Sequence, residues 1–476
     1  MDLRLTLLSI YVCSLGVSNA EVAENGSIPM VPLIPLIPSQ PTEKAENEST
    51  AQPDVADATK IPVTVSPGEE TSEEEEEGCM SIGRSPESRA AIATAIQKLG
   101  LQLLQNLETT PQEPNIIISP LSISLALSQL VLGAVNETEE LLMSHLHGHT
   151  LPCYHQSLRN VMVNLRNNDL KIATRIFLRQ GFYPKELFLN ESRRLYDSEP
   201  SVLESVEQIN QWVENATQGK MTDFLSGLPP NLLIMLINAV HFKGEWKARF
   251  DARFTTRGVF YLDDSRMVDV DVMEDAKHPL SFFFHSELEA QVAKFPFTKG
   301  MSLLVVMPLS SQVKLSSLYS KINISELYNR LPKERAVQVK VPKFKLDYAQ
   351  DLQDVFTKMG MGQLFSNPNL ADMADGPLLV SSVKHKSSME INEEGAEASA
   401  ATTVVISRAS NPIFHLNRPF FFALMDDMTQ VPIFMGIINN PSPDAPVLQK
   451  GENGGKDKVV FPLDKNSEGS FGGPPK

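Results

Sequence analysis

The chain has 476 residues, of which 42% are hydrophobic and 21% charged, enough for one large core or two to three average domains. Its formal net charge of −16 is uneven, because residues 21–78 hold 14 acidic side chains against two lysines. The rest of the chain is near neutral and has no basic footprint. The composition therefore argues against nucleic acid as a partner.

The first twenty residues determine the expected compartment. Arg4 precedes an apolar stretch from Leu5 to Val17, and Ser18-Asn19-Ala20 forms a small-x-small cleavage site. This pattern is typical of a secretory signal peptide, residues 1–20. An N-terminal membrane anchor is the alternative, but the stretch is too short to span a bilayer, and no other apolar run of about 18 residues occurs. We expect a secreted, extracellular protein with no membrane partner.

Cysteines and sequons agree with secretion. Cys13 leaves with the signal peptide, so the mature chain keeps Cys79 and Cys153. An even pair in an oxidising compartment suggests one disulfide, although two separate buried thiols stay open as an alternative. Six N-x-S/T sequons predict N-glycosylation. They lie at Asn25, Asn47, Asn136, Asn190, Asn215 and Asn323.

Next in the chain, residues 21–84 are rich in Pro, Glu, Ser and Thr and are expected to be a disordered acidic extension. A helix should begin at Ser85-Pro86, where a capping serine precedes a proline at the first helical position. Apolar spacing predicts another helix over Val206–Ala216, ending near Gly219. From Asn439 the composition reverts to Pro, Gly, Lys and Asp, which predicts a mobile tail over residues 442–476.

Leu232–Val240 is almost wholly apolar, with only Asn238 interrupting, and predicts a strand buried on both faces. Further strand-like runs are Ser302–Met307, Val341–Leu346, Leu378–Val383, Phe414–Asp426 and Ile433–Ile438. Helices dominate the first half and strands the second. We therefore expect a mixed α+β domain over residues 85–441.

Enzymatic motifs are mostly absent from the sequence, which has no G-x-S-x-G, no H-E-x-x-H, no phosphate loop and no C-x-x-C, so we do not expect an enzyme. One cluster could bind zinc if it lay on an extended strand. It consists of His145, His147, His149, Cys153 and His155. The alternative is a polar helix end and loop, with Cys153 bonded to Cys79. Closed zinc sites usually draw ligand pairs from two segments, so we expect no metal and no cofactor.

Residues 396–407 carry only small, β-branched or short polar side chains apart from Glu397. Read with period two, one face can be buried and the other solvated, as in an ordinary half-buried strand. A polar turn with a single basic residue, Arg408-Ala409-Ser410-Asn411-Pro412, follows at once. An exposed arginine directly after a strand-competent segment is unusual for a static sheet.

Five motifs in the correct order, over about 350 residues, resemble the successive signatures of the serpin family. They are Asn115-Ile-Ile-Ile-Ser119-Pro120-Leu-Ser122-Ile with Gly133-Ala134; Leu236-Ile-Asn238-Ala239-Val-His-Phe242-Lys243-Gly244-Glu-Trp246; Glu393-Glu394-Gly395-Ala396-Glu397-Ala398; Asn417-Arg418-Pro419-Phe420; and Pro432-Ile-Phe434-Met435-Gly436. The resemblance implies an α+β serpin fold: a large central sheet with further sheets, about eight or nine helices and an exposed reactive loop.

The resemblance also implies a suicide-substrate mechanism. A protease would cut the Arg408-Ala409 bond, and the freed loop would then insert into the main sheet as an extra strand, a switch driven by stored strain. The implied hinge residues are Glu393, Glu394, Gly395, Ala396, Glu397 and Ala398. The residues implied to let the sheet open are Ser119, Ser122, Asn238 and His385, with Trp246 where the loop first inserts. For these, satisfied buried polar residues are the alternative.

The loop departs from the family pattern at one point. Counted from Glu393, Arg408 is the sixteenth residue, one short of the usual inhibitory spacing, which would place Ala409 at the scissile position. We choose Arg408 because no other Lys or Arg lies between Glu393 and Arg418. Arg418 itself is followed by Pro419, which disfavours cleavage.

Trypsin-like serine proteases are the implied targets, with plasmin first, because the bait and tail are most similar to family members that inhibit plasmin. These act in fibrinolysis in blood plasma as monomers. Their lysine tail binds the kringle modules of plasmin, for which this chain offers Lys450, Lys458, Lys465 and the terminal Lys476. A merely solvating tail is the alternative.

Fibrin is a further candidate partner, but the mature start Glu21-Val22-Ala23-Glu24 lacks the glutamine through which a transglutaminase would attach it, and the first glutamine is Gln40. Two other functions stay open. One is a non-inhibitory serpin acting as carrier or chaperone, and the other is an extracellular interaction protein that works through its tails.

Overall fold

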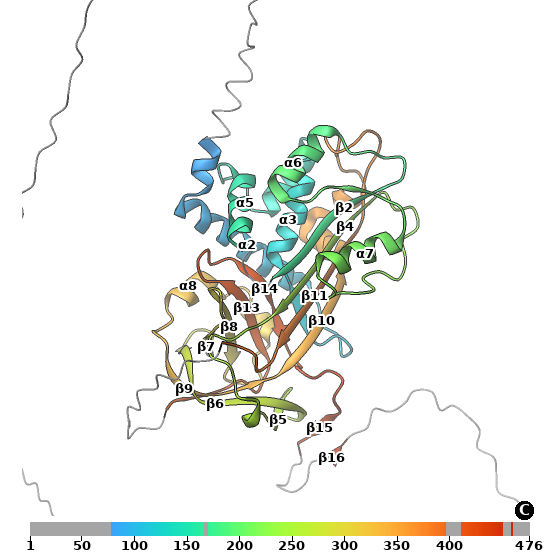
Figure 1. Cartoon of the computed structure of the whole chain (residues 1–476). Coiled ribbons are helices and arrows are strands. Elements are labelled where there is room, and N and C mark those ends of the chain that lie inside the picture. The colour runs from blue at the N-terminus through green and yellow to red at the C-terminus, as the bar shows by residue number, and fades with distance from the viewer. Residues whose placement is uncertain (1–77, 166–169, 397–410, 451–457, 460–476) are drawn as a thin grey trace, which may run out of the picture. The chain divides into compact units, whose positions relative to one another are not determined.

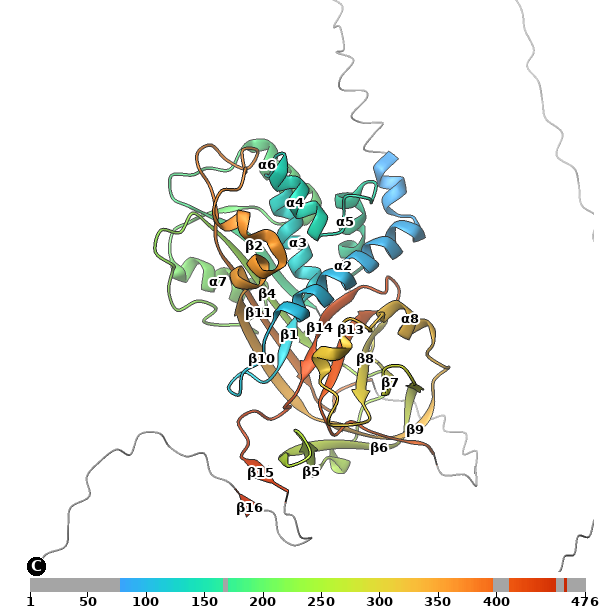
Figure 2. The ribbon, with the colours of Figure 1, turned by 180° about the vertical axis from the view of Figure 1, so that it is seen from behind.

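The computed structural model describes residues 78–165, 170–396, 411–450 and 458–459, all within one contact unit over residues 65–476. Two β-sheets and a group of helices make up this part (Figure 1). The helices are α2 (Pro86–Asn106), α3 (Pro120–Val131), α4 (Glu137–His145), α5 (Tyr154–Leu165), α6 (Glu186–Tyr196), α7 (Val206–Ala216), α8 (Ile324–Asn329) and α9 (Gln353–Phe356). Helices α2 to α6 lie together, while α7 lies apart from them (Figure 2).

Two helix starts follow from capping, as expected. The Ser85 hydroxyl accepts a hydrogen bond from the Ser88 amide at 3.0 Å, and Pro86 occupies the first turn of α2. The Ser205 hydroxyl caps α7 in the same way, and α7 covers the predicted range Val206–Ala216. Residues 78–83 are helical too, so ordered structure begins ahead of Ser85.

One sheet has the strand order β10-β11-β4-β2-β3. Its strands are β2 (Lys171–Arg179), β3 (Ser201–Leu203), β4 (Ile234–Lys243), β10 (Phe344–Asp351) and β11 (Val380–Ile391). Strand β4 is buried along its length except at Lys243, which confirms the predicted strand covered on both faces. Its two faces alternate between two cores, as the pleat requires.

The two cores differ in size and in the elements that pack around them. Leu236 and Val240 face the large core, which contains α3 and the second sheet. Met235 and Ile237 face a small core with Ile209 of α7. Helix α7 therefore covers one face of the five-stranded sheet while α3 packs on the other, as Figure 1 shows.

The second sheet is larger and follows the order β1-β14-β13-β8-β7-β6-β15-β16, with β5 and β9 pairing β6 and β12 pairing β9. Its strands are β1 (Ile116–Ile118), β5 (Thr256–Tyr261), β6 (Arg266–His285), β7 (Ala290–Pro296), β8 (Met301–Pro308), β9 (Arg335–Pro342), β12 (Ile413–His415), β13 (Phe420–Asp426), β14 (Pro432–Ile438), β15 (Val447–Gln449) and β16 (Lys458–Val459). Its centre, β8, β13 and β14, is fully buried.

Two predicted strands are wrong in extent. The run Val341–Leu346 spans the end of β9 and the start of β10, because the chain changes sheets at Lys343. The run Phe414–Asp426 contains two strands, β12 and β13, that pair with different neighbours. A strand-like run does not reveal such a change of sheet, because each part of it has the pattern of a strand on its own.

Candidate functional site

The candidate site lies where β4 and β11 run side by side in the same direction. Their parallel pairing extends from Val380 opposite Ile234 to Glu390 opposite Lys243, and we call it the β4/β11 seam. Because the strands are parallel, both chains leave the seam at the same end. The chain after β4 leads to Trp246, and the chain after β11 leads to residues Glu393–Ala396, which we call the exit segment.

At that end the exit segment pairs with the chain around Trp246. The Trp246 amide donates to the Glu394 carbonyl at 3.0 Å, and the Ala396 amide donates to the Trp246 carbonyl at 2.8 Å. Gly395 forms a parallel bridge with Trp246 and approaches it so closely that a Cβ there would clash with the Trp246 carbonyl oxygen. Only glycine fits this position without a shift of the backbone.

Trp246 itself is fully buried and anchors the end of the seam. Its ring stacks on Phe297 with centroids 4.4 Å apart and meets Phe250 edge to face. Its indole N–H donates to the Asn392 carbonyl at 2.7 Å, directly before the exit segment. The side chain therefore joins the large core to the backbone that leaves β11.

Two acidic side chains of the exit segment are each held by a lysine. Glu394 lies 2.6 Å from the Lys243 ammonium. Glu393 lies 2.9 Å from Lys343 and accepts a hydrogen bond from the Thr255 hydroxyl at 2.8 Å. Burial alone would raise the pKa of Glu393, but these hydrogen bonds outweigh it and leave the pKa below its usual value. The hydrogen bond that the Lys243 ammonium donates to Glu394 raises the pKa of Lys243.

A buried polar cluster holds the middle of the seam, made of Ser119, Ser122, Asn238 and His385. Asn238 and His385 are register partners across the seam. The Asn238 side-chain oxygen accepts from the Ser122 hydroxyl at 2.8 Å and from His385 Nδ1 at 3.0 Å. The Ser119 amide donates to His385 Nε2 at 3.3 Å. All four residues are at most 1% exposed, so α3 is hydrogen-bonded to both strands inside the core.

These partners define the state of the His385 ring. Nε2 accepts from an amide, so Nδ1 must carry the proton that it donates to Asn238. A second proton on Nε2 would face the Ser119 N–H. Burial lowers the pKa of His385 from 6.5 to about 3, although a hydrogen bond with the Ile117 backbone opposes this. The ring is therefore neutral at physiological pH.

Sequence reasoning brought together the hinge residues Glu393 to Ala396, the four members of the polar cluster and Trp246, and the structure places all of them along one seam. It missed Lys343 and Thr255, which both contact Glu393. They are far from Glu393 in the sequence, so no local pattern indicates these contacts. It also missed Asn392, although its place directly before the exit segment could have indicated it.

Several predicted site residues lie outside the described residues. They are Glu397, Ala398, Arg408, Ala409, Lys465, Lys476, Asn25 and Asn47. Of the tail, residues 442–450 are described, and β15 pairs with β6, so this part of the expected mobile tail belongs to a sheet. Lys450 is exposed, with its ammonium 5.7 Å from the centre of the Tyr261 ring. Lys458 lies in β16, opposite Gln449.

The structure contains a disulfide between Cys79 and Cys153. Three of the histidines in the cluster contact other groups. Both ring nitrogens of His145 contact backbone carbonyls, His147 contacts the Gln102 side-chain oxygen, and His155 contacts the Tyr196 hydroxyl. Among the described residues, no group of three or more metal-ligating side chains is found. Four sequon asparagines are exposed, namely Asn136, Asn190, Asn215 and Asn323.

Within the described part of the chain, no helix combines the length and the apolar character needed to cross a membrane.

Comparisons with known proteins agree with the fold and the motifs. The family model described as serpin (serine protease inhibitor) matches residues 94–441. Alpha-2-antiplasmin of Mus musculus is 38% identical over 393 residues, 81% of this chain and 80% of that protein. Alpha-2-antiplasmin of Bos taurus is 37% identical over 381 residues, covering 79% and 77%.

Solved structures share the fold. Mouse protein-Z dependent protease inhibitor superimposes with a TM-score of 0.67 at 24% identity, over 75% of this chain and 98% of that chain. This likeness concerns the fold alone. Together with the family match over most of the chain and relatives above 30% identity, it identifies the protein as a member of the serpin family.

Proposed function

We propose that the protein is a secreted suicide-substrate inhibitor of trypsin-like serine proteases, with plasmin as its main target, and that it regulates fibrinolysis. The observation that carries the proposal is the place of the exit segment. It continues β11 at the end of the β4/β11 seam where both chains leave it, which we call the open end. The residues that follow are therefore connected to a place where a new strand can enter between β4 and β11.

The chemistry begins at Arg408. Its guanidinium enters the anionic primary pocket of the protease, the protease serine attacks the Arg408 carbonyl, and the bond to Ala409 breaks with release of a new amino terminus. An ester then joins the Arg408 carbonyl to the protease serine. Insertion of the freed segment before hydrolysis of this ester carries the protease away and distorts its active site.

The seam is built in a way that favours such an insertion. A segment that turns back after β11 runs antiparallel to both β4 and β11, so one parallel pairing is exchanged for two antiparallel ones. Antiparallel pairing is slightly more stable per residue. Asn238 and His385 must first separate, which breaks their 3.0 Å hydrogen bond. The polar cluster therefore sets the resistance to opening.

Other parts of the proposal rest on the sequence. Residues 1–20 serve as the signal peptide, residues 21–84 as an acidic extension, residues 85–441 as the inhibitory domain and residues 442–476 as a tail. A terminal lysine presents an ammonium and a carboxylate together, the group that kringle modules bind. Tethering through Lys476 raises the effective concentration of the protease at the bait.

The direct test mixes the protein with plasmin and examines the products on denaturing gels, with amino-terminal sequencing of the released peptide. We expect a covalent complex and a new terminus at Ala409. Arg408→Ala should abolish both, while Arg418→Ala should abolish neither. Cleavage at another bond, or no cleavage, contradicts the proposal and favours a non-inhibitory serpin.

A second test separates trapping from cleavage. Ala396→Arg places a charge where the inserting strand must be buried, while both backbone hydrogen bonds of Ala396 can remain. We expect cleavage at Arg408 to persist and the covalent complex to disappear. The control is Ala252→Arg, the same change at an exposed residue outside the seam. A complex that survives Ala396→Arg overturns the insertion mechanism.

Removal of residues 451–476 tests the tail. We expect plasmin to be trapped about 10-fold or more slowly, with an unchanged final yield of complex, because tethering changes only the effective concentration. Trypsin, which has no kringles, should react equally with both forms. An unchanged rate with plasmin contradicts the role of the tail.

A further inference from the structure

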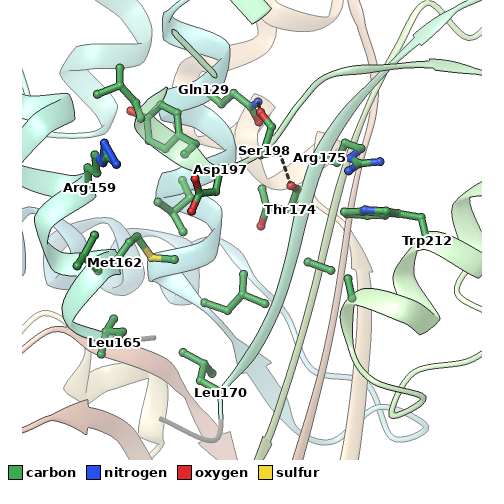
Figure 3. A pocket seen from close by; sticks show the side chains of 17 residues that line it. Gln129, Arg159, Met162, Leu165, Leu170, Thr174, Arg175, Asp197, Ser198 and Trp212 are labelled. Atoms are coloured by element: carbon green, nitrogen blue, oxygen red, sulfur yellow. Dashed lines mark hydrogen bonds between the residues drawn. The ribbon is translucent and has the colours of Figure 1, made fainter. Parts of the chain in front are cut away.

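A cavity of about 370 Å³ lies between α3, α5, α6, α7 and strand β2, away from the β4/β11 seam. Figure 3 shows its lining, with Arg159 of α5 on one side, Trp212 of α7 on the other and Gln129 of α3 between them. The volume falls in the range of small-molecule sites, about 300–1,000 Å³. No role in the proposed inhibitory mechanism uses this cavity.

The cavity exists because β2 lacks a neighbouring strand along most of one edge. Strand β3 pairs only with Phe177–Arg179, so Lys171–Ile176 have no strand partner on that side within the described residues. The loop after α6 covers part of the edge, where the Ser198 hydroxyl donates to the Thr174 carbonyl at 2.7 Å. The remaining space stays open beside Thr174 and Arg175.

One wall of the cavity is apolar. Met162 and Leu165 of α5 lie there with Leu170 just before β2, and Figure 3 shows them on the same side of the space. Ile172 and Leu195 add to the lining. Such a wall suits the hydrocarbon body of a ligand, because binding there would remove apolar surface of both the wall and the ligand from water.

Polar atoms without partners occur on the rest of the lining. Gln129 Oε1, Thr174 Oγ1 and Arg175 Nε are buried and have no hydrogen-bond partner among the described residues. Gln129 is 0% exposed, and its amide group is oriented by a 2.8 Å hydrogen bond from Nε2 to the Ser198 carbonyl, which leaves Oε1 as the acceptor. Unpaired buried polar atoms are costly, so three around one cavity indicate groups that a ligand satisfies.

The charges of the lining favour an acid. Arg159 and Arg175 are cationic, against the single carboxylate of Asp197. The Arg175 guanidinium lies 4.6 Å from the Trp212 ring centre, which orients it. Burial lowers the pKa of Arg175, while the nearby Glu199 opposes this but is bound to Arg193 at 3.1 Å. A ligand carboxylate would compensate this partly buried cation.

We propose that this cavity binds a small amphipathic organic acid that carries a hydroxyl group in addition to its carboxylate. The carboxylate accepts from Arg175, the hydroxyl donates to Gln129 Oε1, and the hydrocarbon body lies against Met162, Leu165 and Leu170. The Thr174 side chain lies on the other face of β2 from Arg175, with Ile172 and Ile176, so its hydroxyl can serve the hydroxyl of the ligand.

The test titrates the full-length secreted protein with 3-hydroxydecanoate by isothermal titration calorimetry. Decanoate lacks the hydroxyl, and 1-decanol lacks the carboxylate. We expect saturable binding at one site, with affinity falling from 3-hydroxydecanoate to decanoate to 1-decanol. A cavity that holds water only gives no saturable binding, and that result overturns the proposal, as does equal affinity for all three probes.

Variants locate the site. Arg175→Met keeps the length of the side chain and should weaken decanoate at least about 10-fold, the effect of one hydrogen bond to a charged group, while 1-decanol changes less than about twofold. Gln129→Leu should reduce 3-hydroxydecanoate binding to the level of decanoate. Arg179→Met, on the same strand but outside the cavity, is the matched control and should change nothing.

Met162→Trp fills the half-buried apolar wall and should abolish binding of all three probes. Circular dichroism and the unfolding temperature establish that each variant is folded. If Met162→Trp does not fold, Arg175→Met tests the location of the site instead, because this variant should weaken the binding of decanoate much more than that of 1-decanol. Binding that persists in folded Met162→Trp, or equal effects of Arg175→Met and Arg179→Met, overturns the assignment.

Discussion

Different interactions hold β4 and β11 together at the open end of the seam and in its middle. At the open end, the exit segment is held by two lysine–glutamate pairs, by backbone hydrogen bonds and by the buried Trp246 ring. In the middle, the polar cluster uses neutral hydrogen bonds with no access to water. The charged contacts are partly screened by solvent and salt, whereas the neutral cluster acts at full strength in a low-dielectric interior.

This difference indicates a division of labour. The open end can be loosened in small steps, because each half-exposed ion pair contributes little by itself. The middle resists until Asn238 and His385 part, because a buried polar group that loses its partner carries the full desolvation cost. In the proposed insertion mechanism, strand entry therefore starts easily at the open end and is controlled at the polar cluster.

Removal of the Trp246 ring should have the largest effect. Trp246→Ala deletes a fully buried side chain and its hydrogen bond to Asn392, and we expect the free energy of unfolding to fall by about 3–5 kcal/mol. Trp246→Phe retains ring packing and loses the hydrogen bond, so it should lose less than half as much. Urea unfolding followed by circular dichroism measures both, and equal losses would show that the hydrogen bond rather than the ring anchors the end.

Removal of the shared acceptor in the middle should rank second. Asn238→Ala leaves His385 Nδ1–H without a partner, while Ser122 can still donate to the Ser119 carbonyl at 3.1 Å. We expect a loss of about 1–3 kcal/mol in unfolding free energy. Ser128→Ala is the control, because Ser128 lies on α3 with Ser122 but is bonded to Tyr154, outside the polar cluster, and this change should cost about 1 kcal/mol. If Asn238→Ala leaves the free energy of unfolding unchanged, the polar cluster does not hold the middle of the seam.

Acid should weaken the middle through His385. Its pKa is lowered from 6.5 to about 3 by burial, so the unfolded chain binds a proton more readily than the folded one. The stabilisation is therefore complete above pH 6.5 and is lost as the pH falls toward 3. Between pH 7.5 and 5.5 the expected loss is about 1.4 kcal/mol.

The measurement compares wild type with His385→Gln at both pH values by urea unfolding. The difference between them isolates His385, because other groups with shifted pKa values, such as His155 and Glu393, are present in both proteins. The pH-dependent loss in wild type should exceed that in the variant. Identical pH profiles would assign the acid sensitivity to another residue.

The lysine at the open end should have the smallest effect. Lys243→Met breaks the 2.6 Å pair with Glu394, but the Glu394 side chain is 57% exposed. We expect a loss below about 1 kcal/mol that shrinks further in 1 M salt. A loss that is large and independent of salt would mean that the open end is held like the middle.

The residues of the site were predictable from sequence because they occur in short ordered motifs, while their contacts were not. Asn238 stood out as the one polar residue in the apolar run Leu232–Val240, and strand β4 follows from that run. Its partner His385 is 147 residues away, and nothing local indicates the pairing. Similarly, Lys343 lies at the change of sheet that the strand-like run Val341–Leu346 concealed.

In the fold, too, features that depend on neighbouring residues were predictable, whereas features that depend on distant pairing were not. Capping at Ser85 and apolar spacing in Val206–Ala216 gave correct helix starts, since both depend on neighbours within one turn. Strand β6, 20 residues long, shows no single alternation because it pairs with β5 and β9 along one part and with β7 along another. Tertiary pairing of this kind overrides any local pattern.

The distance in sequence between the two strands of the seam also affects how the chain folds during its synthesis. During synthesis β4 emerges well before β11, and 147 residues at about 5–20 residues per second correspond to roughly 7–30 s. For that time one edge of β4, an almost wholly apolar strand, has no partner of its own. Such an edge can pair with a strand from another nascent chain. The seam through which the proposed mechanism inserts a strand in the finished protein thus exposes the unfinished chain to misassembly.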